Sequence, residues 1–127
     1  MTTETKIPSV TNGTLNIETS MQGPSVVVTM VGSAEAQSPD FLQSFFGRLH
    51  AEALRSQVTE VAVDLRRVEF LNSVSLKAFV SWIVELEEEN SAHRYRIRFV
   101  SDTAVPWQRR SLQALRALAA DLIVVDS

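Results

Sequence analysis

The residues of this chain whose types and spacing could do chemistry gather in one stretch, between positions 64 and 75. Asp64 lies near the end of the apolar segment 61–65, and Asn72-Ser73 directly precedes an amphipathic segment that is typical of a helix. This order places a small hydroxyl at the first turn of a helix, just beyond the carboxyl end of a strand. Free backbone N–H groups and the positive end of the helix dipole meet there, so Ser73 is the first candidate functional residue.

A simpler interpretation of the same turn is helix capping. Asn and Ser are both preferred N-cap residues, so either Asn72 or Ser73 could accept a hydrogen bond from the first helical turn. Whichever residue does not cap the helix would keep a free side chain at the turn. The sequence leaves both interpretations open.

The chain offers few groups for catalysis. Asp64 could act as a general base, but a carboxylate satisfied by loop N–H groups is the more common arrangement at such a position. A Ser-His-Asp triad would need a histidine beside Ser73, and His50 lies inside a predicted helix while His93 lies beside a strand entrance. The four glycines match no phosphate-binding loop. We therefore predict that the protein is not an enzyme.

Composition argues against several other classes of function. The chain has no cysteine, so disulfides and thiolate metal sites cannot form, and its two histidines match no metal-ligand spacing. The net charge of −3 gives no reason to expect nucleic acid, whose binders carry a concentrated basic surface. No apolar run approaches the length of about 18 residues that a membrane span needs, and the N-terminus lacks the apolar run of a signal peptide. We expect a cytoplasmic protein without metal, cofactor, nucleic-acid partner or membrane span.

The first third of the chain predicts a hairpin. Residues 14–18 alternate polar and apolar types, as in a half-exposed strand. A turn at Gly23-Pro24 leads into the β-branched run 26–31, which is typical of a strand covered on both faces. The two strands should pair antiparallel.

A helix and a central strand follow the hairpin. Ser38-Pro39-Asp40 has the composition of a helix start. Apolar residues then recur at helical spacing: Leu42, Phe45, Phe46, Leu49 and Ala53. Strand 60–65 is apolar on both faces, which predicts a position near the centre of a sheet, and Arg66-Arg67 predicts a charged turn after it.

The second half repeats this alternation of helix and strand. A helix from about residue 74 buries four residues at helical spacing: Leu76, Phe79, Val80 and Ile83. Segment 94–100 alternates basic and apolar types, Pro106 begins a further helix, and 122–125 is a last short strand.

The element order β-β-α-β-α-β-α-β predicts an α/β fold. Its sheet should be mixed and mostly parallel, with about five strands and with helices packed on it, because each strand after the hairpin is followed by a helix. Residues 1–13 are polar and predict a flexible N-terminal tail, and residues 14–127 predict a single domain.

Two surface features are candidates for contacts. Trp107 follows Pro106 at a helix start, where it is hard to bury, and so it is a candidate contact residue. The acidic run 85–89 ends the second helix, where negative charge opposes the helix dipole. A solvated helix end and a partner-facing acidic patch both fit this run.

The stretch from strand 61–65 to Ser75 resembles the STAS domains, the family of bacterial anti-sigma factor antagonists. In that family an apolar strand ends in Asp-Leu, as Asp64-Leu65 does here, and a short loop leads to an Asp-Ser-Ser-Gly-type turn and a helix. The turn reads Asn72-Ser73-Val74-Ser75 in this chain, so an asparagine, a valine and a serine replace the aspartate, the second serine and the glycine. The order of elements fits the family across roughly residues 14–125.

The resemblance implies a regulatory module that switches between protein partners. In the family, a serine kinase that is also the anti-sigma factor phosphorylates the serine at the start of this helix, and a phosphatase reverses the modification. Carried over, the phosphorylated residue is Ser73, with Ser75 as the alternative. The implied partner-binding residues are Asn72, Ser73, Ser75, Lys77 and Trp107. Two alternative functions stay open: a small-ligand sensor for a nucleotide or lipid, and a non-phosphorylated scaffold of the same fold. The protein could also form a homodimer.

Overall fold

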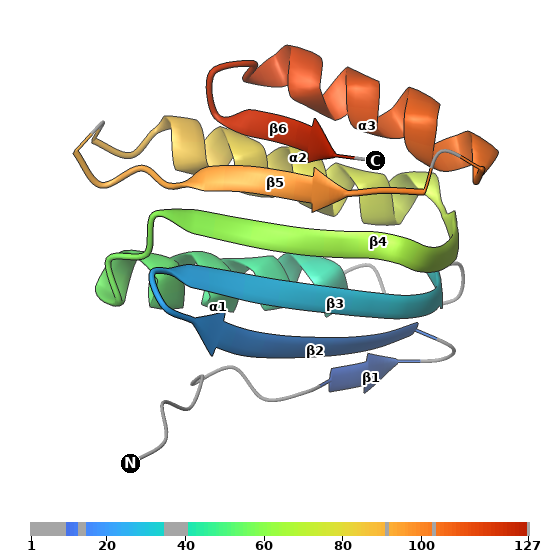
Figure 1. Ribbon diagram of the computed structural model, residues 1–127, viewed down its shortest axis with the longest axis horizontal. Coiled ribbons are helices and arrows are strands. Elements are labelled where there is room, and N and C mark those ends of the chain that lie inside the picture. Colours follow the sequence, from blue (N-terminus) through green and yellow to red (C-terminus); the bar gives the residue numbers. More distant parts are fainter. Residues whose placement is uncertain (1–9, 13–14, 35–40, 91, 103, 127) are drawn as a thin grey trace.

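The computed structural model describes residues 10–12, 15–34, 41–90, 92–102 and 104–126. Their strands and helices form one sheet and one layer of helices (Figure 1). The strands are β1 (Val10–Asn12), β2 (Leu15–Gln22), β3 (Ser25–Ala34), β4 (Glu60–Leu71), β5 (Arg96–Val100) and β6 (Ile123–Asp126). The helices are α1 (Phe41–Arg55), α2 (Ser73–Glu87) and α3 (Pro106–Leu118).

The strands lie side by side in the order in which the chain visits them, from β1 to β6. β1, β2 and β3 pair antiparallel, and β3, β4, β5 and β6 pair parallel. The predicted mixed, mostly parallel α/β fold is confirmed, as is the central position of strand 61–65, which lies in β4 between β3 and β5. Residues 10–12 of the expected tail pair with β2, and residues 1–9 and 13 lie outside the described part.

All three helices lie on one face of the sheet (Figure 1). Each connection from β3 to β6 leads to the next strand on the same side of the one before it. Because such connections are right-handed, they place every helix on the same face of the sheet. Polar side chains lie on the opposite face, where Arg98 pairs with Glu60 at 2.9 Å and with Asp126 at 3.2 Å. Val27 on that face is only half-buried, so the predicted two-sided cover of strand 26–31 is wrong. The strands on either side of β3 partly cover its β-branched residues on this face, but no helix in the described part of the chain packs over them.

β4 extends through Leu71, so the predicted charged turn at Arg66-Arg67 is also wrong. β3 continues beside β4 as far as Ala34, and the register between them shifts twice on the way. Arg66 and Arg67 are both exposed, which breaks the alternation of a regular strand as a β-bulge does. Gly32 lies at one of these shifts with a φ of 113°, a backbone conformation that favours glycine.

The core lies between the sheet and the helices and contains the predicted α1 stripe and part of the predicted α2 stripe, in which Leu76 and Val80 are only half-buried. The predicted α1 stripe is entirely buried: Leu42, Phe45, Phe46, Leu49 and Ala53. In α2, Phe79 and Ile83 are fully buried, and Trp82 stacks on Phe46 with ring centroids 4.6 Å apart. The predicted helix start at 38–40 lies outside the described residues.

Candidate functional site

The candidate site is the turn between β4 and α2, and Asn72 is the residue that caps it. Asn72 has extended backbone dihedrals (φ −78°, ψ 171°), and its Oδ1 accepts a hydrogen bond of 2.8 Å from the backbone N–H of Ser75. Ser73 is the first helical residue, and its side chain is exposed. The cap therefore uses the asparagine side chain and does not need the hydroxyl of exposed Ser73.

The other predicted site residues of α2 divide between its two faces. Ser75 is only 5% exposed and lies on the same helical face as Phe79 and Trp82. An enzyme could not reach its hydroxyl without opening the helix, so Ser75 is a poor alternative to Ser73. Lys77 is exposed one turn beyond Ser73, at the i+4 position.

The predicted contact residue Trp107 is held by the fold. It is half-buried at the start of α3, and its indole Nε1–H donates to the backbone carbonyl of Val68 at 3.2 Å. It therefore anchors α3 to the last part of β4, a few residues before the Asn72 cap. Trp107 offers only part of its ring to a partner.

Gln108, which sequence reasoning missed, does most to fix this end of β4. Its side chain is completely buried, and its Nε2 donates to the carbonyls of Leu65 at 2.6 Å and Val68 at 3.1 Å. Its Oε1 accepts from the backbone N–H of Asp102 at 2.9 Å. One signal was available, because Gln108 is the polar member of the buried stripe that continues with Leu112 and Leu115.

Asp64 is satisfied within the fold, but mainly by the side chain of Arg66 and not by the predicted loop N–H groups. Its carboxylate accepts from the backbone N–H of Arg66 at 3.1 Å and from the guanidinium of the same residue at 3.0 and 2.8 Å. The hydrogen bond from the Arg66 side chain is the main cause that lowers the pKa of Asp64 below its usual value. A carboxylate held in its ionised form by an arginine is a weak general base.

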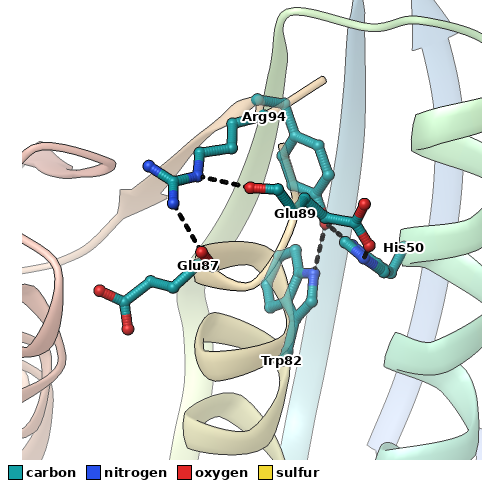
Figure 2. A network of polar contacts seen from close by, with 6 residues as sticks. His50, Trp82, Glu87, Glu89 and Arg94 are labelled. Carbon is teal, nitrogen blue, oxygen red and sulfur yellow. Dashed lines mark hydrogen bonds and ion pairs between the residues drawn. The ribbon is translucent and has the colours of Figure 1, made fainter. Parts of the chain in front are cut away.

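Neither histidine is near Ser73. His50 is buried in α1 and contacts Glu89, which lies beyond the carboxyl end of α2 (Figure 2). Ser73 begins α2, and a helix of this length spans about 22 Å. His93 is exposed in the segment after Glu89. A Ser-His-Asp arrangement is therefore absent from this turn.

The polar network at the far end of α2 holds the helix in place (Figure 2). The indole of Trp82 donates to the Tyr95 hydroxyl at 2.7 Å, and that hydroxyl lies 2.8 Å from Nδ1 of His50. The other ring nitrogen of His50 lies 3.1 Å from Glu89. All of these groups are satisfied if Tyr95 donates to Nδ1 and the Nε2–H donates to Glu89. Burial is the main cause that raises the pKa of Tyr95, so it remains a neutral hydrogen-bonding group.

Two large apolar side chains close to Ser73 in the chain are exposed. Phe70 is 45% exposed and Val74 is 46% exposed, and the two flank the Asn72-Ser73 turn in the chain. Exposed large apolar side chains beside a free hydroxyl are more typical of a site that binds a protein than of one that binds a small polar ligand. Among the described residues, no group of three His, Cys, Asp or Glu could hold a metal ion, and no helix is long and apolar enough to cross a membrane.

Comparison with known proteins identifies the fold. No family model and no curated protein matches the sequence. A solved anti-sigma factor antagonist from Mycobacterium paratuberculosis is similar in structure, with a TM-score of 0.63 and 18% identity over 88% of this chain and 85% of that one. The anti-sigma factor antagonist SpoIIAA in its unphosphorylated form matches with a TM-score of 0.56 and 17% identity, over 76% of this chain and 81% of that one.

A third similar structure comes from a different signalling context. It is a chain of the complex between the diguanylate cyclase SiaD and its activator SiaC from Pseudomonas aeruginosa. The TM-score is 0.61 and the identity 20%, and the match covers 94% of this chain and 96% of that one. At these identities the likeness shows the fold alone. The chain thus has the SpoIIAA-like (STAS) fold that the sequence resemblance led us to expect.

Proposed function

We propose that this chain is a regulatory protein-interaction domain of the anti-sigma factor antagonist type, and not an enzyme. The beginning of α2 binds a protein partner, and phosphorylation of Ser73 by a serine kinase releases that partner. A phosphatase restores binding. The fold supports the class of function, and the Asn72-Ser73 turn supports the choice of residue.

The free hydroxyl of Ser73 is the observation that carries this proposal. A kinase needs a serine whose side chain is exposed and is not required to hold the backbone. Ser73 meets both conditions because Asn72 supplies the cap. Ser75 fails the first condition, since it is buried against the core.

The switch acts through charge at the surface. Phosphorylation adds about −1.5 to −2 charges and three strong acceptor oxygens at the positive end of the helix dipole. No acidic residue lies in the first turn of α2, and exposed Lys77 is one turn away, so the domain itself tolerates the new charge. A partner packed on Phe70 and Val74 would instead bury an unpaired dianion and lose affinity.

The first experiment compares protein partners captured by three variants from the host cell. Ser73→Ala should retain the wild-type partner, and Ser73→Asp should lose it while keeping the wild-type circular dichroism spectrum. Ser44→Asp is the matched control, because Ser44 is also an exposed helical serine but lies in α1. Equal capture by Ser73→Asp and wild type would contradict the proposal.

The second experiment tests the modification directly. Mass spectrometry of the protein purified from its host should find a phosphoryl group on the peptide that carries Ser73, and treatment with a serine phosphatase should remove it. The same peptide from Ser73→Ala should stay unmodified. If the partner depends on the turn but no phosphoryl group is found under any growth condition, the domain is a non-phosphorylated scaffold.

A further inference from the structure

A groove runs between α1 and α2 on the side of these helices that faces solvent. Its volume is about 440 Å³, and its floor is formed by the stacked rings of Phe46 and Trp82. Gly47 of α1 and Ser81 of α2 line it and are both exposed. Val84 adds a large apolar side chain that is almost half exposed. The groove is thus apolar at its base and open to another molecule.

Gly47 has no role within the chain that explains it. It lies inside α1 without a positive φ, and a Cβ added to it would meet no atom within 4 Å. Glycine in a helix interior is less stable than alanine, so neither backbone conformation nor internal packing favours it here. Its one structural effect is to leave the backbone of α1 uncovered along the groove, where a second helix could approach closely.

The rim of the groove is acidic. Glu85 and Glu88 line it and are exposed, and neither joins any ion pair found in the described part of the chain. Both lie near the carboxyl end of α2, where the helix dipole makes negative charge unfavourable. Arg94 forms no ion pair with them, and its guanidinium donates instead to the backbone carbonyls of Glu87 and Glu89 (Figure 2). A matching surface would be cationic, with small or apolar residues between its charges.

The outer face of α3 has that composition. α3 buries Gln108, Leu112 and Leu115. It exposes three arginines, two alanines and a leucine: Arg109, Arg110, Arg116, Ala114, Ala117 and Leu118. None of these arginines joins an ion pair among the described residues. The chain therefore carries both a cationic helix face and an acidic groove, on different parts of its helical layer.

We propose that two copies of this chain associate by placing the outer face of α3 of one copy in the α1–α2 groove of the other. The arginines of α3 meet Glu85 and Glu88, and its alanines pass over Gly47. α2 lies between α1 and α3 in the helical layer (Figure 1), so two copies that face each other can make both contacts at once and close as a two-fold dimer. Ser73 does not line the groove, so the contact can be tested separately from the phosphorylation switch.

Charge exchange on the full chain tests this contact. The variant Glu85→Arg/Glu88→Arg makes groove and helix both positive, and the variant Arg109→Glu/Arg116→Glu makes both negative. Each variant alone should dimerise at least about tenfold more weakly than the wild type in sedimentation velocity at low salt. An equimolar mixture of the two should restore the dimer, because each groove again meets a helix of opposite charge.

Three further measurements separate this contact from general charge effects. Glu18→Arg/Glu69→Arg changes net charge by the same amount at exposed sites outside the groove and should dimerise as the wild type does. Gly47→Leu should weaken the dimer by filling the groove, with no change of charge. Raising NaCl from about 0.05 M to about 0.5 M should also weaken it by screening. A wild type that stays monomeric at all concentrations, or a mixture that stays monomeric, would overturn the proposal.

Discussion

The division of labour between Asn72 and Ser73 predicts unequal effects on stability. Replacing Asn72 with alanine removes the Oδ1 that accepts from the Ser75 N–H at 2.8 Å. Loss of such a cap costs about 1 kcal/mol of the free energy of unfolding, within a range of about 0.5–2 kcal/mol. Ser73→Ala removes an exposed hydroxyl that makes no cap, so its effect should stay within about ±0.5 kcal/mol.

These values are large enough to measure by two methods. For 127 residues, an unfolding entropy of about 2.1 cal/mol/K per residue gives about 0.27 kcal/mol/K, so a loss of 1 kcal/mol lowers Tm by about 4 °C. Urea titration followed by circular dichroism should show the same difference as a lower midpoint with an unchanged m-value. An unchanged m-value would show that Asn72→Ala alters the free energy of unfolding and not the surface exposed on unfolding.

Two conservative variants serve as controls. Asn72→Ser keeps a capping oxygen and should lose only a small part of the stability. Asn72→Asp keeps the cap and adds a charge that the helix dipole favours, which should raise stability by about 0.3–1 kcal/mol at low salt. If Ser73→Ala costs as much as Asn72→Ala, Ser73 shares the cap, and the argument for a free hydroxyl fails.

Three other effects follow from the packing and the charges. Phe79→Ala should cost about 3–5 kcal/mol in urea titration because Phe79 is fully buried, whereas Glu87→Ala should stay within about ±0.5 kcal/mol; equal losses would mean that α2 faces the other way. Tyr95→Phe should cost about 1–3 kcal/mol because it leaves the buried indole N–H of Trp82 without its acceptor, and an unchanged midpoint would contradict the network. The lowered pKa of Asp64 contributes stability that is fully present above the usual carboxyl pKa of about 3.9 and is lost as pH falls through the folded-state pKa. The difference in the free energy of unfolding between wild type and Asp64→Asn should therefore shrink in acid. This difference should be under about 1 kcal/mol because the partner Arg66 is exposed.

The sequence predicted those parts of the fold that depend on local periodicity. The α1 stripe that contains Phe46 and Leu49 is buried as its spacing predicts, because a helical period of apolar residues has one stable orientation against a sheet. The extension of β4 past Arg66-Arg67 could not be predicted in this way. Those arginines stay in a strand only because β3, far back in the chain, continues beside them, and local pattern carries no information about that pairing.

The candidate site divides in the same manner. The burial of Ser75 could have been predicted, since it lies at helical spacing from Phe79 and Trp82 on the buried face. The choice between Asn72 and Ser73 as the cap could not, because the two residue types have nearly equal capping preference. The backbone dihedrals decide it, and those depend on where β4 ends and how it enters the helix.

The two ends of α2 bear on how a phosphoryl group at Ser73 could act. At the carboxyl end, Trp82 and His50 join the Tyr95 hydroxyl in a buried network, so the helix cannot shift without breaking several hydrogen bonds at once. At the amino end, the new charge lies beside free N–H groups and the positive end of the dipole, where it is stabilised. A modification that the native state tolerates, on a helix that is fixed in place, provides no driving force for an internal rearrangement. In the proposed function the signal is therefore read at the surface, and the phosphorylated and unmodified forms should have closely similar backbone chemical shifts beyond the first turn of α2. Differences in backbone chemical shift between the two forms in α1 or β5 would contradict this mechanism even if Ser73 proves to be the modified residue.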